Sequence, residues 1–188
     1  MTGVLVPQRV LADVAKHGLS WPAGRERGGI LLGYRKPEAI EITGLTLPGR
    51  WDRAFPTLFR RSERGHRIRA LREWKGSGHT VDWVGEWHTH PGGTAEPSSI
   101  DRRTWMELAR YTAKPMAFLI FDDQHLFVGL QTHGLGPLKP LSLEGLGCGA
   151  VLFSPQSFGA AASQRNPSRH PLKDLTAPAG VRQPLSQS

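Results

Sequence analysis

The chain has 188 residues, enough for one domain with a substantial core, and a formal net charge of +8. No apolar stretch approaches the roughly 20 residues of a membrane span, and the N-terminus lacks the basic-then-apolar pattern of a secretory signal, so we expect a cytoplasmic protein with no membrane partner. The single cysteine, Cys148, cannot form an internal disulfide and has no nucleophile signature around it; its apolar, glycine-rich neighbours predict a buried thiol.

The first third of the chain predicts one helix followed by a pair of strands. Apolar residues recur at helical spacing over 7–17, and Gly18 ends the pattern. Residues 28–35 and 39–47 predict paired strands joined by a turn that contains proline. Residues 48–59 contain proline and arginine and predict a loop.

Residues 62–75 predict a helix that carries much of the positive charge, including Arg67 and Arg72. Ile68 and Leu71 give this helix an apolar side, so most of its basic residues would face water. A solvated helix surface is the simplest interpretation, and a surface for an acidic protein partner is the main alternative. Nucleic-acid binding is disfavoured because the chain has no recognised DNA-reading motif.

The middle of the chain predicts a strand, a helix and a hairpin. Residues 81–88 are rich in β-branched and aromatic residues and predict a strand. Apolar residues at roughly helical spacing predict a helix over 99–112. Residues 114–122 and 125–132 predict a hairpin that turns at 122–124.

The composition changes near residue 154. Residues 154–188 are rich in Ser, Pro, Gln and Ala and cannot bury enough apolar surface to offset the entropy lost on ordering. We therefore expect a domain over 1–153 and a flexible tail over 154–188, and truncation near Phe153 should leave the chemistry of the domain unchanged. A segment that docks on a partner is the alternative for this tail.

The most specific pattern is His88-Thr89-His90 followed by Asp101. Two imidazoles and a carboxylate form the mixed nitrogen and oxygen set of a catalytic zinc site, with a fourth position left for water. On a strand, residues two apart share a face, so His88 and His90 would project together and Asp101 would approach from the next element. The sequence therefore predicts one zinc ion per chain.

The Ser98-x-x-Asp101 pair also has a purely structural interpretation. It resembles a capping box at a helix N-terminus, with aspartate in place of glutamate. Next to the His-x-His pattern, the same two residues could present a carboxylate and a hydroxyl to one cavity. Trp83, Trp87 and Trp105 are expected in the core or as walls around the metal.

Three separated segments together resemble a known family. Glu26 before Gly-Gly-Ile-Leu-Leu-Gly, the His88-Thr89-His90-Pro91 run, and Ser98-x-x-Asp101 resemble the signature, called JAMM, of the JAB/MPN zinc isopeptidases. The resemblance implies an α/β fold: a mixed, curved β-sheet flanked by helices in a single domain, here with a disordered C-terminal tail.

The resemblance also implies a role for each residue. His88, His90 and Asp101 would hold Zn²⁺, Glu26 would act as the general base, and Ser98 would donate a hydrogen bond to the oxyanion. Glu86 lies two residues before His88 on the same strand, so it is the alternative base, or else a carboxylate that orients a histidine or contacts the substrate.

Residues that flank the signature resemble the bacterial JAB proteins encoded with CBASS antiphage systems. This implies a peptidase that releases a cGAS-like nucleotidyltransferase, conjugated through its C-terminus by an E1–E2-like enzyme, from its target. The substrate tail would bind as an added strand, with residues 47–59 as a wall of the groove. The alternatives are a phage tail-assembly or sulfur-carrier-processing JAB peptidase, a non-catalytic MPN scaffold, and a basic nucleic-acid-binding module.

Overall fold

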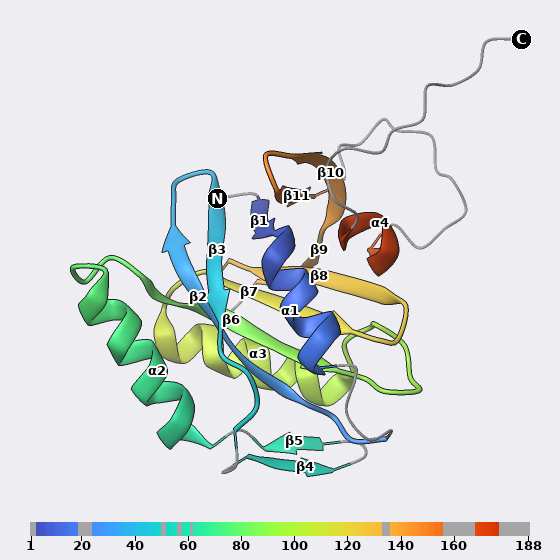
Figure 1. Cartoon of the computed structure of the whole chain (residues 1–188), viewed down its shortest axis with the longest axis horizontal. Helices are drawn as coiled ribbons and strands as arrows, with labels where there is room; N and C mark the ends of the chain where they lie inside the picture. Colours follow the sequence, from blue (N-terminus) through green and yellow to red (C-terminus); the bar gives the residue numbers. More distant parts are fainter. Residues whose placement is uncertain are drawn as a thin grey trace, which may run out of the picture.

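The computed structural model is organised around one large mixed β-sheet with helices on both faces (Figure 1). It describes residues 3–18, 24–49, 52–55, 58–60, 62–132, 136–155 and 168–176. Among the helices in these ranges, none is both long and apolar enough to cross a bilayer.

The large sheet has ten strands in the described part of the chain, in the order β10-β11-β1-β3-β2-β6-β7-β8-β12, with β9 also paired to β8. Pairing is parallel between β1 and β3 and between β6 and β7, and antiparallel elsewhere. The strands are β1 (Gly3–Pro7), β2 (Gly28–Arg35), β3 (Ala39–Leu45), β6 (Asp82–Thr89), β7 (Met116–Phe121), β8 (His125–Gln131), β9 (Lys139–Pro140), β10 (Ser142–Gly147), β11 (Ala150–Ser154) and β12 (Arg169–Pro171). A separate two-stranded sheet joins β4 (Arg53–Phe55) to β5 (Leu58–Arg60).

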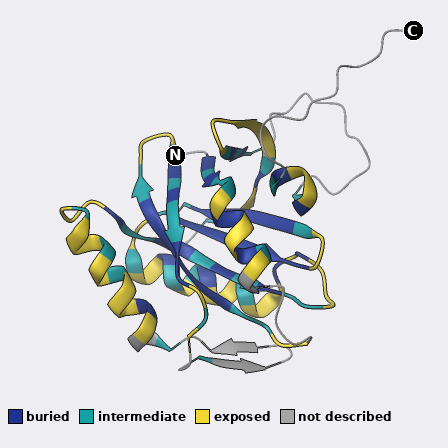
Figure 2. Cartoon of the chain, in the orientation of Figure 1, coloured by how far each residue is buried: buried dark blue, intermediate teal, exposed yellow. Residues whose placement is uncertain are grey.

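The helices divide between the two faces of the large sheet. They are α1 (Gln8–Gly18), α2 (Glu63–Gly76), α3 (Ser99–Thr112) and α4 (Leu172–Thr176). The main core cluster takes Leu11 from α1, Leu119 from β7 and Leu175 from α4. A second cluster takes Trp105 from α3 and Phe118 from β7. The central strands of the sheet are therefore buried between helices, as the dark strands in Figure 2 show.

The central strands carry the sequence features of a sheet covered on both faces. Every residue of β7, from Met116 to Phe121, is buried, because its side chains reach the two clusters alternately. At β6, a side chain on Gly85 would overlap the carbonyl oxygen of Ala117 on β7, so glycine is required there.

The α/β class and the flanked mixed sheet are confirmed, and the elements predicted between residues 7 and 132 form with end shifts of one or two residues. The predicted loop over 48–59 contains β4 and β5, which are too short to show a period. Two side-chain expectations are wrong. Cys148 is exposed, because it lies in the β10–β11 turn with φ of 52°. Ile68 and Leu71 on α2 are exposed, because the helix instead turns His66 and Ala70 toward the sheet.

The expected boundary at residue 153 is wrong for residues 168–176. In that segment β12 pairs with β8, and Leu172 and Leu175 enter the main core. Their burial stabilises the segment on the domain, although its composition is polar and lacks a long apolar pattern. The remainder of the predicted tail, residues 156–167 and 177–188, lies outside the described residues.

Candidate metal centre

The end of β6 and the start of α3 bring together the three predicted ligands. His88 lies near the end of β6, and His90 follows the strand, where its backbone N–H donates to the Phe121 carbonyl of β7 at 2.8 Å. Asp101 is in the first turn of α3. The ring of Trp105, one turn farther along α3, lies 5.8 Å from the ring of His88 and forms one wall.

The candidate ligand atoms of the three side chains lie close together. The Nε2 atoms of His88 and His90 are 3.0 Å apart. Asp101 Oδ1 lies 3.4 Å from His88 Nε2, and Asp101 Oδ2 lies 3.6 Å from His90 Nε2. Zn–N and Zn–O bonds of about 2.0–2.2 Å in a tetrahedron place ligand atoms about 3.3–3.5 Å apart. The His–His and His–Asp distances are near this spacing, and one ligand atom from each residue lies within 4.8 Å of the others, so the residue types and their proximity suit one zinc ion.

The electrostatics favour the neutral form of His90 and the ionised form of Asp101. Burial lowers the pKa of His90 and the neighbouring His88 lowers it further, so His90 is neutral at pH 7. Burial alone would raise the pKa of Asp101, but hydrogen bonds and charge interaction with His88 and hydrogen bonds from Ser98 lower it to about 2. The site thus presents a neutral imidazole and an ionised carboxylate, as a metal requires.

Ser98 and Asp101 also form the capping box that the sequence allowed. The Asp101 backbone N–H donates to Ser98 Oγ at 3.2 Å, and the Ser98 backbone N–H donates to Asp101 Oδ2 at 2.7 Å. Ser98 Oγ additionally donates to Asp101 Oδ2 at 2.6 Å. The structural and functional interpretations are compatible, because the cap holds one carboxylate oxygen while the other faces His88.

Residues 7–129 match the family described as prokaryotic homologs of the JAB domain. The chain belongs to this JAB family. A Pseudomonas aeruginosa protein named "CD-NTase/cGAS isopeptidase" is 37% identical over 107 residues, which cover 56% of this chain and 68% of that protein. An Escherichia coli protein of the same name is 31% identical over 126 residues, covering 67% of this chain and 80% of that protein.

The fold of this JAB domain is also similar to a solved structure. The solution structure of protein DSY2949 from Desulfitobacterium hafniense matches with a TM-score of 0.54 and 18% sequence identity, over 71% of this chain and 86% of that one. The JAB family match ends at residue 129, so β9–β12 and α4 lie beyond it.

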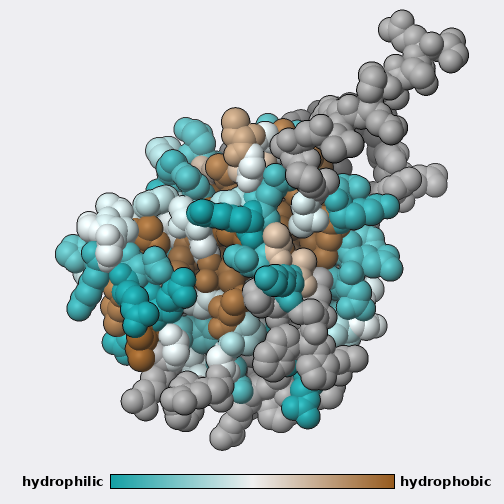
Figure 3. Space-filling model, in the orientation of Figure 1, coloured by the Kyte–Doolittle hydropathy of each residue, from teal (hydrophilic) through white to brown (hydrophobic). Residues whose placement is uncertain are grey.

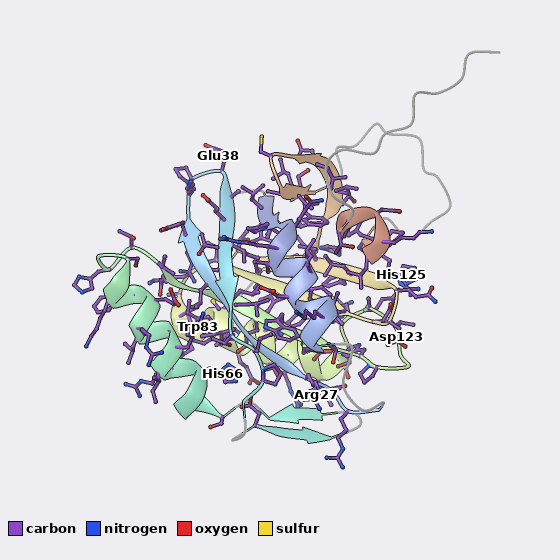
Figure 4. All side chains as sticks on the ribbon, viewed as in Figure 1. Arg27, Glu38, His66, Trp83, Asp123 and His125 are labelled. Atoms are coloured by element: carbon purple, nitrogen blue, oxygen red, sulfur yellow. The ribbon has the colours of Figure 1, made fainter. Side chains whose placement is uncertain are left out.

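In this JAB domain, Glu26 precedes β2 beside the metal strand. Gly28 pairs with His88, and Thr89 extends the pairing by donating its N–H to the Arg27 carbonyl at 2.7 Å. The Arg27 N–H in turn donates to Thr89 Oγ1 at 3.0 Å. Glu26 directly precedes Arg27, which Figure 4 labels at the lower end of the sheet.

Glu86 and the three tryptophans of the JAB domain occupy different surroundings. Glu86 pairs with Ile30 and keeps the same face of β6 as His88, because the register shift between β2 and β6 lies farther back along β6. Trp87 faces the main core, where its Nε1 donates to the Thr46 carbonyl at 3.0 Å. Trp83 packs against the other two clusters. Trp105 has a ring contact with the candidate ligand His88.

Sequence reasoning missed the groups that hold the loop between His90 and Ser98. The Thr94 carbonyl accepts a hydrogen bond from His90 Nδ1 at 2.9 Å, which leaves the lone pair on Nε2, the nitrogen that lies near His88 and Asp101. The next backbone N–H, of Ala95, donates to Asp122 Oδ2 at 2.9 Å. The only sequence signal was a polar residue in the predicted turn at 122–124, which does not reveal a partner 27 positions away.

Proposed function

We propose that this chain is a zinc-dependent JAB isopeptidase that releases a conjugated protein from its target. The observation that carries the proposal is the convergence of His88, His90 and Asp101, whose ligand atoms lie within 4.8 Å of one another. The proposal is supported by membership of the JAB family and by relatives that are named "CD-NTase/cGAS isopeptidase".

The division of labour follows from the chemistry of amide hydrolysis. Zinc at this site would act as a Lewis acid that makes water nucleophilic at neutral pH. Glu26 takes a proton from the attacking water and delivers it to the nitrogen of the leaving amine. The hydroxyl of Ser98 donates a hydrogen bond to the oxygen of the carbonyl under attack, a contribution typically of about 3 kcal/mol in acyl-transfer sites. No covalent intermediate with the protein is needed.

We propose that the substrate is a cGAS-like nucleotidyltransferase joined through its C-terminus, by an E1–E2-like enzyme, to an amine of the target. An extended C-terminal tail would bind as an added strand, because this mode gains affinity from main-chain hydrogen bonds along the tail. The enzyme would then cleave directly after the last residue of the nucleotidyltransferase, in the cytoplasm of a cell carrying an antiphage system.

The direct test is cleavage of a fusion that joins the C-terminus of the nucleotidyltransferase to a reporter protein. We expect cut products at the junction, inhibition by a zinc chelator with recovery on adding zinc, and loss of most turnover in Glu26→Gln with zinc content retained. A fusion through a sulfur-carrier protein and an unrelated unfolded peptide serve as comparison substrates. Equal rates on all three would contradict the proposed substrate, and full activity of metal-free protein would contradict the metal mechanism.

A milder effect is expected in Glu86→Gln, because Glu26 occupies the family's glutamate position. If Glu86→Gln abolishes turnover while Glu26→Gln stays active, the base is Glu86.

A further inference from the structure

A single peptide group links the metal ligand His90 to the opposite side of the loop. The carbonyl of Thr94 accepts from His90 Nδ1 at 2.9 Å, and the N–H of the same peptide, on Ala95, donates to Asp122 Oδ2 at 2.9 Å. A carboxylate on the N–H side polarises the peptide and strengthens its carbonyl as an acceptor. The orientation of His90 is therefore coupled to Asp122.

Asp122 is a buried carboxylate with a complete set of donors. Its side chain is 5% exposed. Oδ1 accepts from the backbone N–H groups of Gln124 at 2.8 Å and His125 at 2.6 Å. Burial by itself would raise the pKa of Asp122, but these backbone donors, with Ala95 and Arg169, lower it overall. The carboxylate is thus a fixed negative charge behind the loop.

The counter-charge comes from the C-terminal segment. Arg169 on β12 donates from Nη2 to Asp122 Oδ2 at 2.9 Å and also lies 3.1 Å from His125 Nδ1. Its buried Nε has no hydrogen-bond partner among the described residues, so the guanidinium makes a single-point contact with the carboxylate. In Figure 4, His125 lies beside the β7–β8 turn, close to where this segment joins the sheet.

The segment that carries Arg169 is anchored independently of the metal centre. Leu172 N–H donates to the Gln124 carbonyl at 2.8 Å, and Leu175 is fully buried in the main core. Gln8 Nε2 of α1 donates to the Leu175 carbonyl at 2.9 Å. These contacts hold Arg169 at the β7–β8 turn, and none of them touches a metal ligand.

We infer that Asp122 and Arg169 are positioning residues for the metal centre. Arg169 holds the Asp122 carboxylate against the Ala95 N–H, and the polarised Thr94–Ala95 peptide keeps the proton of His90 on Nδ1 and the lone pair on Nε2. The C-terminal segment, which lies beyond the family match, thereby tunes the affinity of the site for zinc. The inference rests on the proposed metal centre, but it concerns the orientation of His90 and not the substrate.

The test compares four variants of the full chain: Asp122→Asn, Arg169→Ala, Arg169→Lys and, as a control, Lys173→Ala. Lys173 is exposed on α4 in the same segment. Zinc affinity is measured by competition with a chromophoric chelator, and the His90 tautomer is read from ring ¹⁵N shifts in metal-free protein. Changes to residues that contact a metal ligand typically weaken metal binding by about 10–100-fold. We therefore expect the zinc affinity to fall about tenfold or more in Asp122→Asn and about three- to tenfold in Arg169→Ala.

Rescue separates positioning from general stability. Lysine can replace a single-point contact, so Arg169→Lys should stay within about twofold of the parent protein, with Lys173→Ala unchanged. If Asp122→Asn does not fold, the comparison of Arg169→Ala with Arg169→Lys decides the question by itself. The inference would be overturned if Arg169→Ala kept the zinc affinity and the His90 tautomer of the parent protein. It would also be overturned if Arg169→Lys lost as much zinc affinity as Arg169→Ala. Because the tautomer is read without metal or substrate, failure of the proposed function leaves this result interpretable.

Discussion

At the N-terminus of α3, the two oxygens of Asp101 face different partners. Oδ2 closes the capping box with Ser98, while Oδ1 lies 3.4 Å from His88 Nε2. A side chain that is held by its own helix loses little further freedom on binding an ion, which favours affinity. Helix capping and metal binding should therefore be separable by substitution.

We expect Asp101→Asn to lose zinc while the fold persists. The amide oxygen can still accept from the Ser98 N–H, but the anionic ligand is gone, so affinity should fall by more than the roughly 10–100-fold of outer-shell changes. Ser98→Ala should show the converse: zinc retained, the domain destabilised by about 1 kcal/mol, and turnover reduced about 100-fold or more. Chelator competition measures the zinc affinity of both variants, and thermal unfolding measures their stability. Loss of zinc in Ser98→Ala but not in Asp101→Asn would contradict this assignment.

His170 predicts a dependence of stability on pH. It is buried beside Phe153 and lies with Nε2 3.0 Å from the Leu141 carbonyl. Burial lowers its pKa below the ordinary value of 6.5, despite the opposing effect of the carbonyl. The unfolded chain then binds the proton more readily, so the stabilising contribution is complete above about pH 6.5 and is lost as the pH falls toward the folded pKa.

His170→Gln should therefore flatten the decline in stability on acidification, because glutamine can donate to Leu141 but does not titrate. The measurement is the urea midpoint at pH 7, 6 and 5. His79→Gln, at an exposed position, is the control and should follow the parent protein. An identical pH slope in His170→Gln would show that His170 does not make this contribution.

At the scale of elements, α2 is attached to the sheet through a polar contact. His66 is 4% exposed and bridges Thr46 Oγ1 to Asp52 Oδ2, the latter at 3.0 Å. This bridge turns the other side of α2 outward, where Ile68 and Leu71 are exposed among basic residues (Figure 3).

Removing the bridge should destabilise the domain. His66→Ala leaves the buried side chain of Asp52 without its histidine, and such a loss typically costs about 1–3 kcal/mol. His79→Ala, at the exposed end of the same segment, should change stability by less than about 1 kcal/mol, including its ring contact with Trp74. Equal effects in urea titrations would mean that α2 is not held by His66.

At the scale of the whole molecule, the C-terminal segment is part of the domain. Leu175→Ala should cost about 2–5 kcal/mol, since it empties a fully buried position, whereas Lys173→Ala should be near neutral. Truncation after Phe153 should lower the thermal midpoint, while truncation after Thr176 removes none of the described contacts. If the chain truncated after Phe153 were as stable as the full chain, the domain boundary predicted from the sequence at residue 153 would be correct.

Much of the architecture followed from local pattern. Strands such as 28–35 and the helix Ser99–Thr112 were recognisable because their apolar residues repeat with the period of the element. The strands β1, β10 and β11 were not predicted. The strands β4, β5, β9 and β12 were also missed, since two or three residues carry no period. The predicted orientation of α2 was wrong, because the side of the helix that carries the buried His66 packs on the domain and the side that carries Ile68 does not.

By itself, the sequence indicated the family and predicted the ligand set, because the spacing of His88, His90 and Asp101 reflects strand and helix geometry that is local to each element. Only the tertiary structure decided that Arg169 meets Asp122 across 47 positions, and that Asp122 meets the Ala95 N–H. Those contacts depend on β12 pairing with β8 and on Leu175 reaching the core. Such long-range pairing leaves no periodic trace in the chain, because it is selected by the shape and charge of a surface that exists only after folding.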